Sequence, residues 1–424
     1  MLKKIKIEKL FNTFDYEINF NEKGLTILTG PNGYGKTTIL NIINSLYKNN
    51  LYYFFRLPFK KLEVEFDEVK IEINKSEKNT IEMKTNNENS FIFNEKDINR
   101  EFKKIARDLS YRQVEENRWI NRNGIVYSKE NLIEELTTKD LDLNIVYKKG
   151  NIPKTNKVYL IKEQRLIGKT LEKRRDIHYY RDESNENFNI TVEKYSKELS
   201  KNLKEILAKA SKIGQELDSS FPRRLFEEIN SISEDDFNKR YNKIKEKQKL
   251  LKIYGLSSIE EGNQANYKLE NSKALFVYLN DTESKLIIFD EILKKLKIFS
   301  NILEKRKFAY KTIQIDPEIG FKFISKDEDR NEILLSDLSS GEQQELILLY
   351  ELLFKAEPNT IVLIDEPEIS LHVSWQKEFL NDLQQIVELQ QIEVIIATHS
   401  PQIINGNWDL TVDLFDLVEG KKDE

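Results

Sequence analysis

The apolar residues near the start of the chain follow first a strand period and then a helix period. Residues 1–20 alternate between apolar and polar positions, which predicts half-buried strands. Residues 25–28 form a short apolar strand that leads into a glycine-rich turn, and residues 39–47 have apolar positions at helical spacing. The sequence therefore predicts strand, loop and helix in this order.

The middle of the chain combines a β-rich stretch with a long helical segment. Residues 51–95 alternate as strands, and residues 98–145 are predicted to be helical and polar. Residues 190–310 are mostly helical, but the segment 217–224 interrupts the pattern. We expect two long antiparallel helical stretches, the second running through residues 286–299, that form a short arm rather than a long coiled coil.

Strands and helices alternate again in the last third of the chain, where residues 311–335 favour strands. Short apolar strands are expected at residues 158–161, 360–364 and 393–397, and helices at residues 341–356, 374–390 and 400–405. Because apolar strands that alternate with helices are typical of parallel sheets, this pattern predicts an α/β fold.

Length, charge and cysteine content narrow the possible functions. The chain has 424 residues, which is too long for one ordinary core and suggests a main domain with an insertion. Its net charge of -5 gives no overall attraction to nucleic acid, although a local basic patch is compatible with it. The chain has no cysteine, which excludes disulfides, cysteine-ligated zinc and a cysteine zinc hook.

The expected compartment is the cytosol, without a membrane partner. No apolar run is long enough to cross a bilayer. Residues 1–10 alternate as a strand does and do not resemble a signal peptide.

The glycine-rich turn matches the phosphate-binding pattern G-x-x-x-x-G-K-[ST] and lies between a predicted strand and a predicted helix, as this motif requires. Its glycines allow backbone N–H groups to face phosphate oxygens, and the helix N-terminus adds positive potential. Lys36 would reach the β and γ phosphates of ATP, and Thr37 would ligate Mg²⁺. The predicted ATP-binding residues of this segment are Gly30, Pro31, Asn32, Gly33, Tyr34, Gly35, Lys36, Thr37 and Thr38.

Two acids end the apolar strand at residues 360–364. Asp365 at the strand tip would hold Mg²⁺ through water, and Glu366 would accept a proton from the attacking water. An ordinary surface turn is the alternative for the pair alone, but together with the P-loop the two acids are typical of a Walker B motif.

Two further polar segments flank this strand in the sequence. Residues 338–344 open a helix, where Ser339 and Gly341 place a hydroxyl and free N–H groups at an anion-binding N-terminus; an ordinary helix cap is the alternative. His399 follows the strand at residues 393–397, at the carboxyl end where ligands bind in α/β sheets, and would donate to the γ-phosphate or to the attacking water.

Four motifs follow one another along the chain: the glycine-rich P-loop, the signature at residues 338–344, the Walker B acids and His399. This set resembles ABC-type ATPases of the SMC and RecF kind. Residues 365–372 and 397–404 are similar to the OLD-type branch of these ATPases. The run 338–408, together with residues 217–224, resembles the ATPase subunits of bacterial anti-phage systems such as PARIS (AriA) and Septu (PtuA). The resemblance covers about the first fifty and the last hundred residues well, and the middle weakly.

This resemblance implies an AAA-family P-loop NTPase with an ABC-type head, in which helices flank a mixed β-sheet, and an inserted helical arm. The expected parts are an N-terminal lobe at residues 1–190, the arm at residues 191–310 and a C-terminal lobe at residues 311–424. ATP and Mg²⁺ are the expected cofactors.

The resemblance also carries the family's roles to matching positions. Lys36 and Thr37 match the P-loop, Asp365 and Glu366 match Walker B, and His399 matches the switch histidine. The resemblance thereby implies that Lys36, Glu366 and His399 are catalytic and that Thr37 and Asp365 hold the metal.

Two further parts of the site are expected from the same resemblance. Ser339 and Gly341 match the signature, in which Ser340 replaces the second glycine that is usual in transporters. Gln164 is the candidate for the family's Q-loop, and Arg165 beside it would contact phosphate or the dimer partner. An ordinary surface pair is the alternative interpretation of Gln164 and Arg165.

In this ATPase class, ATP lies between the Walker motifs of one chain and the signature of another. The resemblance therefore implies an ATP-dependent homodimer or a larger assembly, with residues 368–372 as the D-loop that crosses to the partner. Hydrolysis would loosen the dimer, so that ATP is both substrate and conformational switch. The resemblance also implies a separate nuclease or toxin effector. A nuclease within this chain is not expected, because the chain ends soon after His399 and because the acidic groups at residues 234–236 and 327–329 are typical of solvated turns.

Two alternative functions stay open on the sequence. A DNA-repair clamp of the SMC or RecF kind would bind duplex DNA across the closed dimer. Its candidate contacts, which also fit a solvated helix face, are Arg165, Lys169, Lys173, Arg174, Arg175, Arg223 and Arg224. An ATP-locked scaffold would hold an effector with little turnover, and the presence of Glu366 argues against a complete loss of hydrolysis.

Overall fold

The computed structural model groups the chain into two compact units. The first contains Met1–Ser184 and Lys355–Glu424, and the second contains Asn185–Phe354. The predicted arm lies inside the second unit, which also includes residues 311–354, a segment that we expected in the C-terminal lobe. The structure describes residues 1–48, 50–76, 80–86, 89–115, 117–138, 157–161, 172–173, 183–257, 267–305 and 310–419.

The first unit is built on a parallel five-stranded sheet in the order β11-β16-β17-β3-β18. Its strands are β11 (Lys157–Ile161), β16 (Thr360–Asp365), β17 (Glu393–Ala397), β3 (Leu25–Thr29) and β18 (Thr411–Asp413). Every residue of β3 and β16 is buried, as expected for parallel strands that are covered on both faces. The carboxyl ends of β3, β16 and β17 lie at one edge of the sheet, because the strands are neighbours and parallel.

Four helices follow the strands of this sheet in the chain: α1 (Lys36–Tyr47) after β3, α10 (Val373–Gln390) after β16, α11 (Pro401–Ile404) after β17 and α12 (Asp416–Glu419) after β18. The helices predicted at residues 39–47 and 374–390 are confirmed as α1 and α10. Both follow the carboxyl end of a strand of the sheet, and the first two residues of α1, Lys36 and Thr37, contact residues at this edge.

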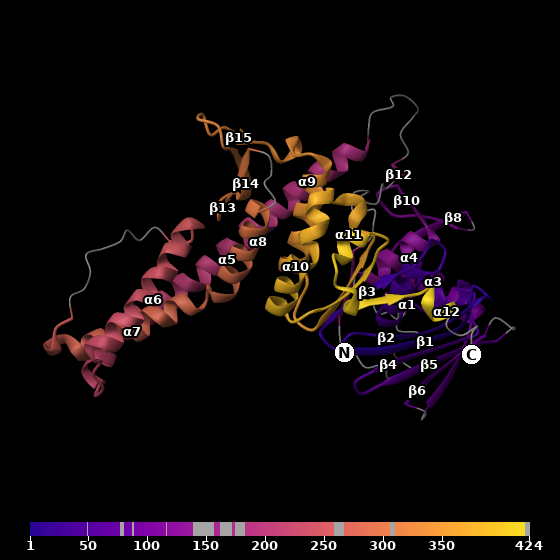
Figure 1. Cartoon of the computed structure of the whole chain (residues 1–424), viewed down its shortest axis with the longest axis horizontal. Coiled ribbons are helices and arrows are strands. Elements are labelled where there is room, and N and C mark those ends of the chain that lie inside the picture. The colour runs from indigo at the N-terminus through magenta and orange to yellow at the C-terminus, as the bar shows by residue number, and fades with distance from the viewer. Residues whose placement is uncertain are drawn as a thin grey trace. The chain divides into compact units, whose positions relative to one another are not determined.

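A second, antiparallel sheet belongs to the same unit, in the order β2-β1-β4-β5-β6-β7 (Figure 1). It contains β1 (Leu2–Leu10), β2 (Phe14–Asn19), β4 (Lys61–Phe66), β5 (Lys70–Ser76), β6 (Thr80–Thr85) and β7 (Asn89–Asn94), and α2 (Leu51–Arg56) precedes β4. Ile5, Ile7 and Leu62 from this sheet share one hydrophobic core with Ile39 and Ile43 of α1. The sheet therefore supports the helix that begins at the P-loop.

The prediction that residues 98–145 are all helical was wrong. Helix α3 (Glu95–Asp108) is followed by three strands, β8 (Arg112–Glu115), β9 (Arg118–Ile120) and β10 (Ile125–Ser128), and then by α4 (Lys129–Thr138). A short strand, β12 (Glu172–Lys173), pairs with β10. The strands form because Gly124, with φ at 78°, makes a tight turn that lets Trp119 pair with Tyr127. Polar residues between these aromatic residues had obscured the strand period.

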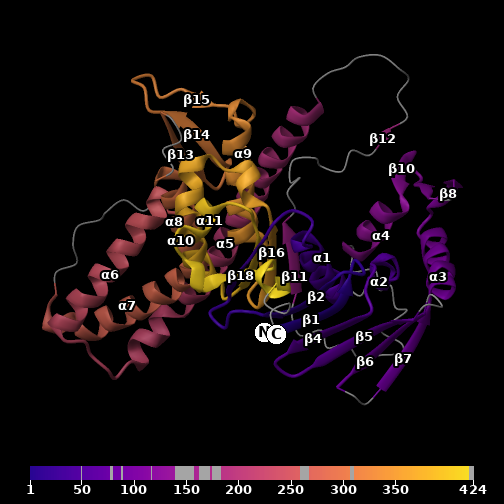
Figure 2. The ribbon, with the colours of Figure 1, turned by 45° about the vertical axis from the view of Figure 1, so that its right-hand side comes forward.

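The second unit consists of long helices and a small sheet. Its helices are α5 (Glu183–Glu227), α6 (Glu234–Ile253), α7 (Ser272–Ile287), α8 (Asp290–Lys305) and α9 (Ser340–Tyr350), which continues as a π-helical turn over Glu351–Lys355. The sheet contains β13 (Lys311–Asp316), β14 (Gly320–Ser325) and β15 (Glu332–Ile333), as predicted for residues 311–335. The single helix predicted through residues 286–299 is divided between α7 and α8. Helices α5, α6 and α7 lie side by side (Figures 1 and 2).

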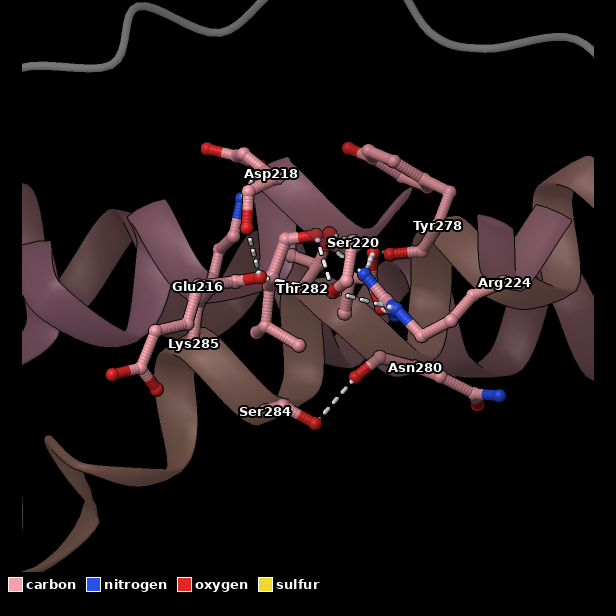
Figure 3. A network of polar contacts seen from close by, with 12 residues as sticks. Glu216, Asp218, Ser220, Arg224, Tyr278, Asn280, Thr282, Ser284 and Lys285 are labelled. Carbon is pink, nitrogen blue, oxygen red and sulfur yellow. Dashed lines mark hydrogen bonds and ion pairs between the residues drawn. The ribbon is translucent and has the colours of Figure 1, made fainter. Parts of the chain in front are cut away.

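The expected interruption at residues 217–224 is absent, because α5 continues through Pro222 to Glu227. Two side chains add hydrogen bonds in the turn before Pro222: Ser220 Oγ donates to the Glu216 carbonyl at 2.9 Å, and an Arg224 nitrogen donates to the Leu217 carbonyl at 2.6 Å (Figure 3). Pro222 has no N–H to donate to the carbonyl of Asp218, so it removes a backbone hydrogen bond near the C-terminal end of the helix without ending it. Arg224 is paired with Asp281 of α7, so this candidate DNA contact is used inside the second unit.

Candidate functional site

The P-loop connects β3 to α1 through a backbone that only glycine adopts easily. Gly30, Gly33 and Gly35 have φ values of 130°, 87° and 89°. A Cβ on Gly35 would lie 3.2 Å from Leu10 Cδ2, so the loop also passes close to the β1–β2 turn. Tyr34 anchors the loop, because its carbonyl accepts a hydrogen bond from the hydroxyl of Tyr16 at 2.7 Å.

Lys36 is buried at the start of α1 and points toward the end of β17. Its Nζ donates to the Gly30 carbonyl at 2.9 Å and lies 2.7 Å from Nε2 of His399. Burial lowers the pKa of Lys36, and the negative charge of Glu366 opposes this shift. The structure thus brings together a lysine and a histidine that are far apart in the sequence.

Thr37 and Asp365 face each other across the same edge. The hydroxyl of Thr37 donates to Oδ1 of Asp365 at 2.9 Å. A hydroxyl and a carboxylate are oxygen ligands of the kind that Mg²⁺ prefers, and Mg²⁺ commonly takes few protein ligands and completes its shell with water and phosphate oxygens. These two residues therefore fit the predicted metal position.

Glu366 follows Asp365 in a left-handed backbone conformation, with φ at 44° and ψ at 59°. This conformation brings its Oε1 to 3.0 Å from Nε2 of His399. Burial is the main reason that the pKa of Glu366 rises to about 8, and the carboxyl group of Glu368 adds to the shift. Burial, with the nearby charge of Lys36, lowers the pKa of His399.

Sequence analysis missed one residue at the centre of this arrangement. Glu368 was expected only as the first residue of the D-loop, but its Oε1 accepts hydrogen bonds from Thr398 Oγ1, His399 N and Ser400 N of the same chain at 2.6, 2.7 and 3.0 Å. The sequence signal for this residue was a further acid two positions after Glu366. A short 3-10 turn over Pro367–Ser370 places it beneath the histidine loop.

Ser339 and Gly341 belong to the second unit, at the N-terminus of α9. Ser339 caps this helix in a capping box with Glu342, whose carboxylate accepts from Ser339 N at 2.8 Å. Lys311 of β13 forms an ion pair with Glu342 at 2.8 Å. Ser339 is exposed, so the helix cap leaves this signature position at the surface.

The other residues that the sequence analysis singled out are either not described by the structure or lie at its surface. Gln164, Arg165, Lys169, Arg174 and Arg175 lie outside the described residues. Among the other P-loop positions, Pro31, Asn32 and Gly33 are exposed, and Thr38 is partly exposed in the first turn of α1. Arg223 is also exposed.

The helices in the described part of the chain include none that is both long enough and apolar enough to span a membrane.

Comparison with a protein-family model gave one match, which covers residues 1–404 and is described as the AAA ATPase domain. Local similarity to individual proteins is confined to shorter stretches. A retron Ec83 probable ATPase from Escherichia coli is 36% identical over 88 residues, which are 18% of this chain and 16% of that protein. The Septu protein PtuA from Bacillus thuringiensis is 38% identical over 76 residues, 18% of each chain. These matches span only a small part of the relatives' own length.

Comparison with solved structures matched SMC head domains. The Smc head domain from Pyrococcus furiosus, bound to the C-terminal domain of ScpA, is 14% identical, and the alignment covers 95% of this chain and 90% of that chain with a TM-score of 0.36. The SMC head domain from Thermotoga maritima is 10% identical, with coverage of 95% and 90% and a TM-score of 0.33.

Proposed function

Because the chain belongs to the AAA ATPase domain family, we propose that it binds ATP with Mg²⁺ and hydrolyses ATP at the carboxyl edge of the parallel sheet. The observation that carries this proposal is the convergence of Lys36, Glu366 and His399 from the ends of three neighbouring strands. Ligands bind at this edge of open α/β sheets, because the loops beyond the strands can enclose them.

The glycine-rich loop would hold the phosphates of ATP by its backbone N–H groups at the N-terminus of α1. Lys36 would pair with the β and γ phosphates, and Thr37 and Asp365 would hold Mg²⁺. Bound Mg²⁺ neutralises negative charge on the phosphates. Held in this way, the γ-phosphate would be within reach of Glu366 and His399, which lie beside Lys36.

Glu366 would accept the proton of the attacking water. A base works best when its pKa is near the operating pH, and burial raises the pKa of Glu366 into this range. His399, which lies 3.0 Å from Glu366, would orient the water or donate to the γ-phosphate. Its lowered pKa favours the neutral imidazole, in which one ring nitrogen is a donor and the other an acceptor.

The signature at Ser339 would complete the site from a second copy of the chain. Ser339 is an exposed residue at the N-terminus of α9, and its hydroxyl, which donates to the Glu342 carboxylate at 3.0 Å, would turn to contact a phosphate held by the partner. ATP would then hold two copies together, and hydrolysis would release them. In this scheme the dimer is the unit that switches.

The chain is related to ATPases of retron and Septu systems, and we extend this relation to its role. The ATP-dependent dimer, acting in the cytoplasm, would control a separate effector, for which a nuclease is the main candidate, in anti-phage defence. The surface that binds the effector would be exposed in one nucleotide state and covered in the other, so that the effector binds in one state only.

A Glu366→Gln variant tests this proposal, with Glu378→Gln on the exposed side of α10 as the control. ATP hydrolysis and molecular mass are measured together with ATP and Mg²⁺. We expect Glu366→Gln to lose hydrolysis by at least about a hundredfold, since it cannot accept the proton, and to accumulate as an ATP-bound dimer. Hydrolysis at the parent rate would contradict the role of Glu366, and a mass that does not depend on ATP would contradict the dimer.

A further inference from the structure

We propose that Glu368 is a positioning residue that fixes His399 against Glu366 and Lys36. The proposal rests on the ATPase function proposed above, since it concerns the same site. Glu368 lies in the turn between β16 and α10, whereas His399 lies in the turn after β17. A carboxylate that joins these two turns couples the end of the Walker B strand to the histidine loop.

The contacts of Glu368 are concentrated on one oxygen. Its Oε1 accepts from the Thr398 hydroxyl at 2.6 Å, from His399 N at 2.7 Å and from Ser400 N at 3.0 Å. Thr398 is fully buried, Ser400 and Glu368 are partly buried and His399 is exposed, so Glu368 joins a buried residue to the exposed histidine beside it. The carboxylate therefore holds the backbone on both sides of the His399 side chain.

Gln376 of α10 forms hydrogen bonds with the same two turns. Gln376 Nε2 donates to the carbonyl oxygens of Leu371 at 3.0 Å and of Glu368 at 3.3 Å. Its Oε1 accepts from the Ser400 hydroxyl at 2.7 Å. Because Gln376 is itself buried, the Glu368 turn and the histidine loop are held as one rigid piece.

The three hydrogen bonds to one oxygen of Glu368 favour an acid at this position over a neutral side chain. One oxygen that accepts three hydrogen bonds is best provided by an ionised carboxylate, because charge-assisted hydrogen bonds are about twice as strong as neutral ones. A glutamine in its place offers a neutral carbonyl, which holds the loop more weakly. The imidazole of His399 would then lose its fixed distance of 3.0 Å to Glu366.

The expected effect is on the reaction and not on nucleotide binding. In the described part of the chain, the hydrogen bonds of Glu368 go to the turns after β16 and β17 and not to the P-loop. Displacing a reacting group by about 1 Å costs up to roughly a hundredfold in rate. Loss of Glu368 should therefore lower kcat and leave the KM for ATP nearly unchanged.

The test uses the full chain with Glu368→Gln and Glu368→Ala, and Glu378→Ala on α10 as the matched control. The kcat is divided by the number of ATP-binding sites, titrated with a fluorescent ATP analogue, so that unfolded protein does not count. We expect kcat per site to fall roughly 10- to 100-fold, with KM changed less than about threefold, for both Glu368 variants. A kcat per site equal to that of the control, or a KM that rises as much as kcat falls, would overturn the proposal.

Histidine NMR separates this proposal from the ATPase proposal. The chain has three histidines, so the ring resonance of His399 can be identified by its loss in a His399→Gln variant. We expect Glu368→Gln to shift this resonance and Glu378→Ala to leave it in place. An unshifted resonance would refute the positioning role even if the parent protein hydrolyses ATP. Conversely, a shifted resonance in a protein without ATPase activity would support the positioning of His399 and refute the proposed reaction.

Discussion

The side chains of Lys36, Glu366 and His399 meet because each follows the end of a strand in the same parallel sheet. A lysine near a buried carboxyl group and a neutral imidazole form a site in which the pKa values of the groups depend on one another. Such coupled groups are typical of functional sites.

Thr37 provides a direct test of the proposed metal position. Thr37→Val keeps the shape of the side chain and removes the hydroxyl that lies 2.9 Å from Asp365. We expect the Mg²⁺ concentration for half-maximal ATPase activity to rise about tenfold, as for the loss of one hydrogen bond or ligand of about 1.4 kcal/mol. Thr37→Ser keeps the hydroxyl and should behave like the parent protein; an equal rise in both variants would contradict the prediction.

How much of the site could be predicted differs between its residues. Lys36 and Thr37 belong to a pattern of fixed spacing, and Asp365 ends a strand whose burial is plain from its apolar run, so their meeting could be expected. The contacts of Glu368 could not, because they depend on the left-handed backbone at Glu366 and on a 3-10 turn that has no period in the sequence. The catalytic and metal-binding roles of these residues stay predictions.

At the scale of elements, two ion pairs connect helices α5 and α7 of the second unit, beside buried apolar residues such as Leu203 and Leu279. Arg224 of α5 makes two hydrogen bonds with the carboxylate of Asp281 on α7, and Lys285 of α7 pairs with Asp218 of α5 (Figure 3). The side chain of Asp281 is 9% exposed, whereas that of Asp218 is 71% exposed. The two ion pairs therefore differ in how much water surrounds them.

This difference gives a prediction about stability. Asp281→Ala leaves the partly buried Arg224 without its partner and should lower the free energy of unfolding by about 2–3 kcal/mol. Asp218→Ala removes an exposed partner and should cost about 0–1 kcal/mol. Urea unfolding followed by circular dichroism measures both, and equal midpoints for the two variants would show that burial of the Arg224–Asp281 pair does not matter.

Elements were predicted best where the apolar residues form an unbroken run or keep a helical spacing. The strands β3, β16 and β17 and the helix α10 are of this kind. The strands β8–β10 were missed because they are short and because charged residues such as Arg118 separate their buried aromatic residues. The break expected at residues 217–224 did not occur: α5 continues through Pro222 to Glu227, and side-chain hydrogen bonds to the carbonyls of Glu216 and Leu217 add to the backbone bonds of this turn.

At the scale of the whole molecule, the chain is an AAA-family ATPase domain with a mixed α/β fold. The P-loop and Walker B belong to the first unit, and the signature helix α9 belongs to the second. We propose that in an ATP-bound dimer the nucleotide would lie between the P-loop of one copy and Ser339 of another. In a symmetric dimer, this arrangement would create two equivalent sites.

Mixing two inactive variants tests this claim most directly. Lys36→Met removes the phosphate-binding amine, and Ser339→Arg blocks the signature, so we expect each variant alone to lack ATPase activity. In a mixed dimer, the intact P-loop of the Ser339→Arg chain would face the intact signature of the Lys36→Met chain. An equal mixture should then recover about a quarter of the parent activity, because about half of the dimers are mixed and each contains one complete site. If the mixture stays as inactive as its components, the site is not shared between two copies.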